Sequence, residues 1–248
     1  SLYIIGFYFH FRHTPMVIAN DNNASGTMGF GTMTKNGDKY ENLTSLWDQG
    51  GITAVKVHPE TGAVFIGYHS GSWIYQYDVT NFIPKFQLPD AAGAAASKGN
   101  INTIAFDKPG TTAYIVSRKN HVIYKASYDM ATGEFSDVKL LAGSFGVTGY
   151  ADGTGTSAQF NEPSQGDVDE EGNFYVADRG NHCIRVITPD GEVSTYAGQN
   201  KAGMVDGIAS LAEFNNPEGC QFGPDGALYI ADYSNHAIRK VEEAQVQP

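Results

Sequence analysis

The chain has 248 residues, of which 41% are hydrophobic and only 17% charged, and its formal net charge at pH 7 is −11. This length is sufficient for one large domain with a substantial core. The acidic balance argues against nucleic acid and acidic membrane surfaces as partners, because phosphate contacts need clustered Lys and Arg. The 29 glycines, 14 tyrosines and 14 phenylalanines favour strands and turns over helices.

The sequence contains neither a disulfide scaffold nor a candidate membrane span. Cys183 and Cys220 are its only cysteines, and we interpret Cys183 as a small buried residue. No stretch approaches the ~20 apolar residues of a transmembrane helix. The opening "SLYIIGFYFHF" is apolar but lacks a basic n-region and a small-residue cleavage site. It predicts a strand inside a mature or truncated chain.

Short strands are predicted along the whole chain, in groups of three separated by Gly, Pro, Asn and Asp turns. The first group is the weakest, with "YIIGFYFHF" at 3–11, "MVIAND" at 16–21 and "TMGFGTMT" at 27–34. The second and third groups, residues 52–78 and 101–129, each contain an apolar run, a glycine turn and further alternating strands. The same pattern therefore recurs along the first half of the chain.

The fourth and fifth groups are copies of one another. Residues 152–186 align with residues 206–240 without a gap, and both contain the core Ala-Asp-x-x-Asn-His-x-Ile-Arg. Asn120 and His121 supply a weaker third copy. The matched pairs include Asp152/Asp206, Gly153/Gly207, Phe160/Phe214, Asn161/Asn215, Pro163/Pro217, Tyr175/Tyr229, Asp178/Asp232, His182/His236 and Arg185/Arg239.

A fourth, outer strand is predicted in some units, as in "KLLAG" at 139–143 and "EVSTYAG" at 192–198. No segment has a helical period of apolar residues. Repeats of about 50 residues, each a small antiparallel sheet, are typical of β-propellers, in which stacked sheets cover each other's faces. We therefore predict an all-β propeller, a single domain over 1–248 with five readable blades. Their approximate bounds are 1–50, 51–98, 99–150, 151–204 and 205–248.

The repeated core resembles the NHL-repeat family of β-propellers, which is named for an Asn-His-Leu sequence. The core is Asn181-His182-Cys183 in one copy and Asn235-His236-Ala237 in the other. The resemblance is strong over residues 140–241, moderate over 52–140 and weak before that. The segments "AQFNEP" and "AEFNNP" resemble secreted Bacteroidetes members, in which an IPT/TIG domain often precedes the propeller. No such domain fits ahead of the first unit.

The resemblance implies an extracytoplasmic location, either periplasmic or on the surface of a bacterial cell. It also implies six blades, one more than the five readable units. The last unit ends at "IRKVEEAQVQP" without an obvious outer strand. A six-bladed ring results if one blade is missing from this chain, or if a terminal strand such as residues 1–8 completes the last blade. The sequence leaves both alternatives open.

The repeated core contains an Asp, a His and an Arg, a set that also occurs in catalytic sites. A catalytic centre needs each group once, whereas a scaffold needs the same groups in every blade, so we interpret the core as structural. We expect the Asp to accept backbone N–H bonds and the Asn to adopt a left-handed turn. The His is expected to bond a neighbouring blade's backbone, the Ile to face a sheet interface, and the Arg to pair with a carboxylate. The structural residues are Asp178, Asn181, His182, Arg185, Asp232, Asn235, His236 and Arg239.

No metal site is predicted. Some NHL relatives are lyases that hold zinc in the central channel with several histidines, which the starts of the innermost strands would have to supply. The corresponding positions carry no histidine; they lie near Ile52-Thr53, Asn102-Thr103, Ser164-Gln165 and Glu218-Gly219. His10 and His58 are instead expected to cap turns. The acidic run at 167–173 lies in a predicted hairpin turn whose aligned copy lacks the acids, which argues against a calcium loop.

Function is expected in the loops between second and third strands and between blades. These loops differ from one another, and their aromatic, Arg and polar residues suit a glycan, peptide or protein partner. The long loops at 144–157 and 199–210 are expected on the same face, with Tyr150 and Met204 at a binding rim. The candidate ligand-binding residues are Tyr68, His69, Arg118, Lys119, Tyr150, Arg179 and Tyr233.

We predict a non-enzymatic binding or interaction propeller that needs no cofactor. The alternative is a metal-dependent hydrolase, lactonase or lyase with its site at the central channel, for which Glu218, Asn102 and Asp167 are the nearest candidate ligands. No Gly-x-Ser-x-Gly, P-loop or dinucleotide fingerprint favours another chemistry. RNA binding, as in tripartite-motif NHL proteins, needs a basic face that this acidic chain does not offer.

Overall fold

The fold is described from a computed structural model of the 248-residue chain. Side chains are described from Ile52 onward, and the first fifty residues are described as strands alone. The described residues are 3–4, 16–22, 27–36, 39–47, 52–68, 71–78, 81–90 and 99–242. His69, one of the candidate ligand-binding residues, and His10, a predicted turn cap, lie outside them.

Across these ranges the chain forms five antiparallel sheets, numbered here in chain order. The first sheet contains β1 (Tyr3–Ile4), β2 (Met16–Asn22), β3 (Thr27–Asn36) and β4 (Lys39–Trp47). The second contains β5 (Ile52–Val57), β6 (Val64–Tyr68), β7 (Trp73–Tyr77) and β8 (Phe82–Gln87). The third contains β9 (Ile101–Phe106), β10 (Thr112–Ser117), β11 (Val122–Asp129) and β12 (Glu134–Ala142).

The last two sheets contain the close copies of the repeat. The fourth contains β13 (Gly153–Thr154), β14 (Pro163–Val168), β15 (Phe174–Asp178), β16 (Cys183–Ile187) and β17 (Glu192–Gly198). The fifth contains β18 (Pro217–Phe222), β19 (Leu228–Asp232) and β20 (Ala237–Val241). The short 3-10 helices are η1 (Arg118–Asn120), η2 (Gly155–Ser157), η3 (Arg179–Asn181), η4 (Ala209–Leu211) and η5 (Tyr233–Asn235).

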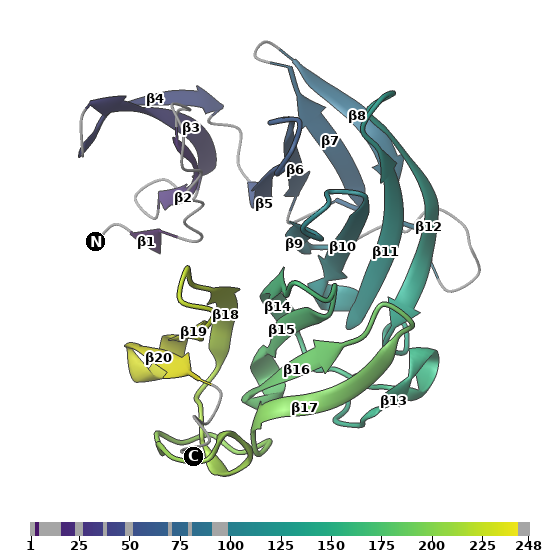
Figure 1. The fold of residues 1–248 in the computed structure, drawn as a ribbon, viewed down its shortest axis with the longest axis vertical. Coiled ribbons are helices and arrows are strands. Elements are labelled where there is room, and N and C mark those ends of the chain that lie inside the picture. Colours follow the sequence, from purple (N-terminus) through teal and green to yellow (C-terminus); the bar gives the residue numbers. More distant parts are fainter. Residues whose placement is uncertain are drawn as a thin grey trace.

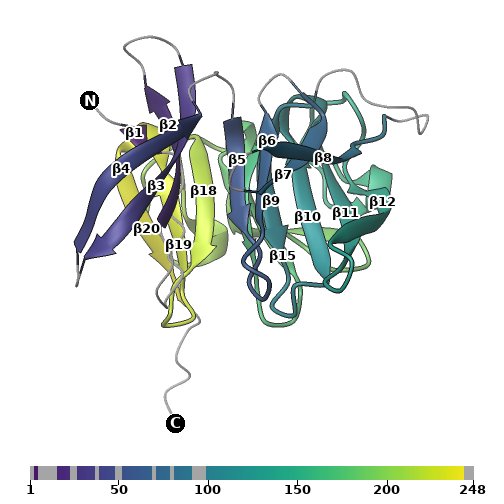
Figure 2. The same ribbon diagram turned by 90° about the horizontal axis from the view of Figure 1, so that it is seen from above.

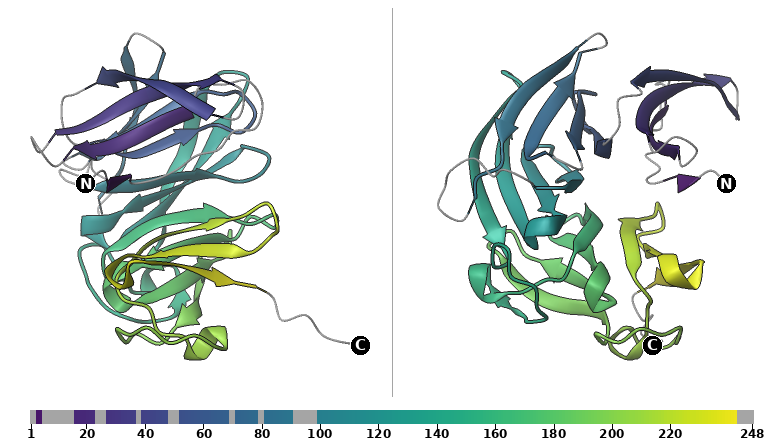
Figure 3. Two further views of the ribbon diagram at one scale, coloured as in Figure 1. Left: turned by 90° about the vertical axis from the view of Figure 1, so that its left-hand side faces the viewer. Right: turned by 180° about the vertical axis from the view of Figure 1, so that it is seen from behind.

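The sheets are arranged in chain order around a common centre, which confirms the predicted all-β propeller (Figure 1). The inner strands β5, β9, β14 and β18 are successive neighbours around that centre. Seen from its edge, the ring has its strands running between two ends where the connections gather (Figure 2). The first and fifth sheets lie on the same side of the ring, opposite the outer strands of the third sheet (Figure 3).

The core lies between neighbouring sheets rather than at the centre of the ring. β9 is buried at all six positions, because the second and fourth sheets cover its two faces. Tyr114 of β10 and Phe174 of β15 stack with their ring centroids 5.2 Å apart, which joins the third sheet to the fourth. Phe160 and Phe214, equivalent residues of the two copies, are both fully buried. Burial on both faces explains the mostly apolar sequence of β9.

Two features of the outer edges differ from the sequence-based expectation. Residues 144–157 were expected to form a loop, but Gly153–Thr154 pair with β17 and extend the fourth sheet outward. The repeat's Ile was expected at a sheet interface, and Ile184 is indeed fully buried against the fifth sheet. Its equivalent Ile238 is 71% exposed, because no sheet follows β20 in the described part of the chain.

The turns at the far ends of the inner strands are stabilised by polar side chains that precede them. His58 Nδ1 accepts the N–H groups of Glu60 and Thr61 at 3.2 and 3.1 Å, the turn-capping role predicted for it. Asp107 and Asp169 occupy the equivalent positions and accept backbone N–H groups of their own turns. These carboxylates therefore serve turn geometry.

Both cysteines are buried, and burial raises the pKa of each thiol far above its ordinary value. Because the thiolate is the reactive form, we expect neither Cys183 nor Cys220 to react with a maleimide in the folded protein. Both should react once the chain is unfolded in denaturant, which mass spectrometry of the labelled protein would measure. Rapid labelling of either cysteine without denaturant would contradict this burial.

Candidate functional site

The repeated Asp-x-x-Asn-His-x-Ile-Arg core forms a buried polar cluster inside the fourth sheet. Asp178 is fully buried; its Oδ1 accepts the Asn161 N–H at 2.8 Å. Its Oδ2 accepts one bond from Asn181 at 2.8 Å and another from Arg185 at 3.0 Å. Arg185 also donates to Asp152 and to two backbone carbonyls. Asp178 thus ties the turn, the third strand and the segment before β14 to one point.

The same contacts recur in the fifth sheet. Asp232 accepts the Asn215 N–H at 2.7 Å, and it accepts further bonds from Asn235 at 2.8 Å and Arg239 at 3.1 Å. Arg239 also pairs with Asp206, the equivalent of Asp152. A catalytic group would be needed once, whereas these contacts are made in both copies. The repetition supports the structural interpretation of the core.

Two histidines connect the third sheet to the fourth and the fourth sheet to the fifth. His121 Nδ1 accepts the N–H of Glu162 at 3.0 Å, and His182 Nδ1 accepts the N–H of Asn216 at 3.0 Å. Each accepted N–H belongs to the residue just before the following inner strand. The left-handed residue of the turn is the histidine, with φ of 57° and 53° at these two positions, and not the asparagine as expected. Asn181 instead lies within η3, where its side chain bonds Asp178 and Gly149.

These inter-sheet bonds predict a loss of stability on acidification. Burial lowers the pKa of His121 below its ordinary value of 6.5, and the charge of Glu162 partly opposes this shift. Burial also lowers the pKa of His182; the charge of Arg179 adds to the lowering and the charge of Asp232 opposes it. As the pH falls, His121 and His182 are protonated in the unfolded chain before they are protonated in the folded protein. The stability that these two neutral histidines contribute is therefore fully present above about pH 6.5 and is lost as the pH falls through their folded pKa values. Thermal unfolding followed between about pH 7.5 and about pH 5 should show a decreasing Tm.

The His182→Asn variant isolates this effect. It removes the acceptor for the Asn216 N–H, so its Tm should be lower than that of the wild type at neutral pH and should depend less on pH. His236→Asn is the matched control, because His236 is the exposed equivalent in the last sheet. Equal pH profiles for the wild type and His182→Asn would contradict the assignment.

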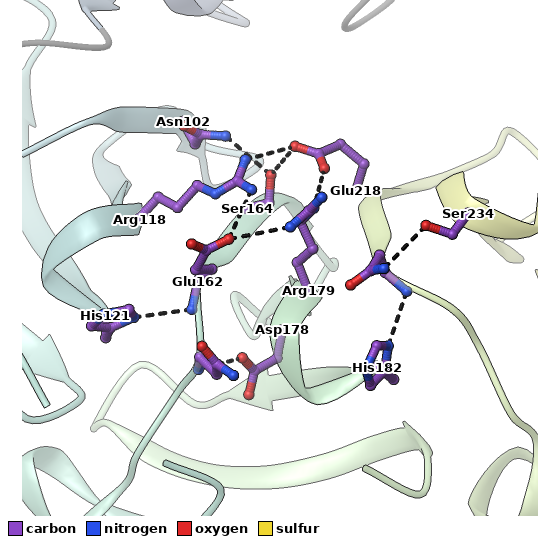
Figure 4. Close-up of polar contacts among 12 residues, drawn as sticks. Asn102, Arg118, His121, Glu162, Ser164, Asp178, Arg179, His182, Glu218 and Ser234 are labelled. Atoms are coloured by element: carbon purple, nitrogen blue, oxygen red, sulfur yellow. Dashed lines mark hydrogen bonds and ion pairs between the residues drawn. The ribbon is translucent and has the colours of Figure 1, made fainter. Parts of the chain in front are cut away.

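A second polar cluster lies where the inner strands begin, which we call the start face of the ring. It contains two arginines and two glutamates in alternation, and we call it the Arg–Glu cluster (Figure 4). Arg118 donates to Glu162 Oε2 at 3.1 Å and to Glu218 Oε1 at 3.0 Å. Arg179 donates to the same Glu162 oxygen at 3.2 Å and to Glu218 Oε2 at 2.8 Å. Four side chains from three sheets thus form a closed ring of ion pairs.

Local structure accounts for each member of this cluster. Arg118 and Arg179 are the first residues of η1 and η3. Each therefore directly follows the second strand of its sheet, at the end of that strand that lies on the start face. Glu162 immediately precedes β14, with a left-handed φ of 52°. Glu218 is the second residue of β18. These elements are far apart in sequence, and the ring arrangement brings them together.

A chain of hydrogen bonds extends the cluster across the inner strands. Ser164 Oγ donates to Glu218 Oε1 at 2.8 Å and accepts from Asn102 Nδ2 at 3.1 Å. Asn102 and Ser164 are buried, so Glu218 is supported from within the ring (Figure 4). The Glu218 carboxylate therefore has partners for both oxygens.

Exposure distinguishes the two glutamates. Glu162 has a side chain that is 46% exposed, against 23% for Glu218, 19% for Arg118 and 24% for Arg179. Partial burial raises the pKa of Glu162, but the hydrogen bond and charge of Arg118, and the charges of Arg179 and His121, outweigh it and hold the pKa below its usual value. Glu162 is therefore ionised at neutral pH.

The structure brings together two of the seven candidate ligand-binding residues, Arg118 and Arg179. Lys119 is exposed next to Arg118, and Tyr233 is exposed on η5. Tyr68, at the end of β6, packs edge-on against Tyr75, and burial raises the pKa of its hydroxyl. These three residues stay candidate ligand-binding residues.

Tyr150 and Met204 were expected at a common rim. The Tyr150 hydroxyl lies 3.0 Å from Thr195 Oγ1 on the outer strand β17, and the ring of Tyr150 packs over Arg185. Tyr150 thus belongs to the outer part of the fourth sheet, away from the inner-strand residues of the Arg–Glu cluster. Met204 is 64% exposed on the loop that leads into the fifth sheet.

Glu162 was not singled out from the sequence, and Glu218 was considered only as a metal ligand. A signal was present in the repeat alignment, where Glu162 occupies the position of Asn216. The metal hypothesis is not supported by the geometry: Asp167 contacts Lys56 and the Phe222 N–H, whereas Glu218 contacts arginines and Ser164. Within the described residues no group of three or more His, Cys, Asp or Glu side chains is placed to hold a metal ion.

The fold and the repeated core define a β-propeller. Residues 160–187 match the NHL repeat family directly. These residues run from Phe160 through the fourth sheet's Asn-His core to the end of β16. Among the described residues, no helix is long and apolar enough to span a membrane.

The structure is similar to an auxiliary nutrient binding protein from Bacteroides thetaiotaomicron, with a TM-score of 0.84 and 27% sequence identity over 96% of this chain and 58% of that chain. The Arabidopsis thaliana protein SUPPRESSOR OF QUENCHING 1 is 26% identical over 81% of this chain and 19% of its own length. Bos taurus NHL repeat-containing protein 2 is 36% identical over 32% of this chain and 11% of its own. The chain therefore spans only part of each relative.

Proposed function

We propose that this chain is a non-enzymatic ligand-binding propeller whose site is the Arg–Glu cluster on the start face. The observation that carries the proposal is the convergence of Arg118 and Arg179 from two different sheets onto partly exposed carboxylates. The Asp178 cluster recurs around Asp232, whereas the closed group of Arg118 and Arg179 with two glutamates occurs once among the described residues. Charged groups that occur once, where several blades meet, are typical of recognition rather than of scaffolding.

The ligand class that fits is a polar molecule such as a glycan fragment or a short peptide, because guanidinium and carboxylate groups offer strong charge-assisted hydrogen bonds. The similarity to a nutrient binding protein of Bacteroides supports a binding role and an extracytoplasmic location, on the bacterial surface or in the periplasm. The alternative of a channel-centred metal hydrolase or lyase is less well supported: Asn102 and Glu218 both contact Ser164, but the Glu218 carboxylate is already engaged by two arginines.

Isothermal titration calorimetry against a panel of oligosaccharides, sugar acids and short peptides tests this proposal. Arg118→Ala and Arg179→Ala should each weaken binding of any hit by at least about tenfold, since a hydrogen bond to a charged group contributes about 1.5–3 kcal/mol. Lys108→Ala is the matched control, because Lys108 is an exposed lysine in the turn at the opposite end of β9. Hits that bind equally to all variants would place the site elsewhere.

A further inference from the structure

We infer that Glu162 occupies the position of a ligand carboxylate in the Arg–Glu cluster, so that the ligand is a small molecule bearing a carboxylate that displaces the Glu162 side chain. This inference rests on the proposed function and specifies its ligand. It concerns the chemistry that Arg118 and Arg179 recognise, which is a planar anion held by two guanidinium groups.

The geometry separates a permanent carboxylate from a replaceable one. Glu218 uses both of its oxygens on the two arginines, at 3.0 and 2.8 Å, and its Oε1 also accepts the hydroxyl of buried Ser164. It therefore orients both guanidinium groups from the interior side. Glu162 contributes a single oxygen, Oε2, which lies between the same two groups at 3.1 and 3.2 Å. Its carboxylate makes fewer contacts and is twice as exposed.

The backbone role of residue 162 does not require a carboxylate. Asn100 and Asn216 precede the inner strands of the third and fifth sheets with φ of 48° and 49°, close to the 52° of Glu162. The bond from the Glu162 N–H to His121 is a main-chain contact, and Asn216 makes the same contact to His182. Asparagine tolerates the left-handed region well, so glutamate at this position is explained by its side chain rather than by its backbone.

Charge balance points to the same ligand. Two arginines and two glutamates leave the cluster with no net charge, and moving the Glu162 side chain into solvent would leave a local charge of +1. A ligand carboxylate bonds both arginines and also restores neutrality, whereas a neutral sugar can bond them but leaves the local charge of +1. Because Glu162 competes for these donors, the wild-type affinity for such a ligand equals the intrinsic affinity multiplied by the fraction of molecules in which Glu162 has left the site.

The test compares Glu162→Asn and Glu162→Gln with the wild type by isothermal titration calorimetry. The probes are galacturonate and glucuronate as sugar acids, N-acetylglycine as an amino-acid carboxylate, and galactose as the neutral counterpart. Removing the internal competitor should strengthen binding of at least one carboxylate probe by about tenfold or more and leave galactose unchanged. The two probe classes distinguish a sugar acid from a peptide-type carboxylate.

Two controls complete the experiment. Glu170→Gln removes an exposed carboxylate paired with Lys108 and should leave every affinity unchanged. Adding Arg118→Ala or Arg179→Ala to Glu162→Asn should abolish the gain. A carboxylate affinity that does not rise in either Glu162 variant overturns the inference. If a neutral ligand binds and depends on Arg118 and Arg179, the proposed function stands and this inference fails, whereas binding of no probe and no panel member contradicts both.

Discussion

Replacing Asp178 with asparagine is expected to lower the free energy of unfolding by about 3–5 kcal/mol, because it removes the buried anionic partner of Arg185 and leaves that buried guanidinium with only the partly exposed Asp152 as a carboxylate partner. Asp178 and Arg185 are both fully buried, and their side chains are 3.0 Å apart. The asparagine side chain has one accepting oxygen, whereas Asp178 uses two. The NH2 group of the asparagine would therefore face at least one of the donors that Asp178 now accepts from, which are the Asn161 N–H, Asn181 and Arg185. Equilibrium denaturation in urea measures the loss.

The equivalent change in the fifth sheet provides the comparison. Asp232→Asn breaks the same contacts, but Arg239 is partly exposed and its second partner Asp206 is almost fully exposed. Water can therefore solvate Arg239 after the change, and the loss of stability should be clearly smaller than for Asp178→Asn. Equal losses at the two positions would show that burial does not control the strength of this contact.

Replacing Ile184 with alanine is expected to cost about 2–5 kcal/mol, the range for removing a buried aliphatic side chain and leaving a cavity. Ile184 is fully buried and packs with Ala212 and Phe214 of the segment that leads into the fifth sheet. The cost should appear in urea denaturation as a lower midpoint with an unchanged slope.

Ile238→Ala is the control for that prediction within the same molecule. Ile238 occupies the same position of the repeat and is 71% exposed. The change should alter stability by no more than about 0.5 kcal/mol. A large loss at Ile238 would mean that another surface covers it in solution.

The propeller was predictable because its signal is repeated. The alignment of 152–186 with 206–240 identifies one structural unit, and the fainter copies before it extend the pattern around the ring. The outer strand β13 was missed because two residues paired by backbone alone leave no pattern of side chains. The left-handed histidine was missed because Asn181 has the stronger intrinsic preference, which its contacts within the buried cluster override.

The candidate site was only half predictable. Arg118 and Arg179 stand out because both occupy the loop position at which the fifth unit has Tyr233. Their partners Glu162 and Glu218 are 44 and 100 residues from Arg118 along the chain. No local pattern reveals contacts of that separation, since the ring arrangement alone creates them. A search for anionic partners at inner-strand starts would have found both glutamates.

The Arg–Glu cluster joins three sheets through side chains alone: Arg118 comes from the third, Glu162 and Arg179 from the fourth, and Glu218 from the fifth. A small rotation of one sheet against another changes several of these four distances together. A ligand that binds one relative arrangement of the sheets more tightly would shift the molecule toward that arrangement. The population of that arrangement would in turn determine the apparent affinity of the ligand. The start face therefore links the positions of three sheets, so that their relative rotation and the geometry of these four ion pairs change together.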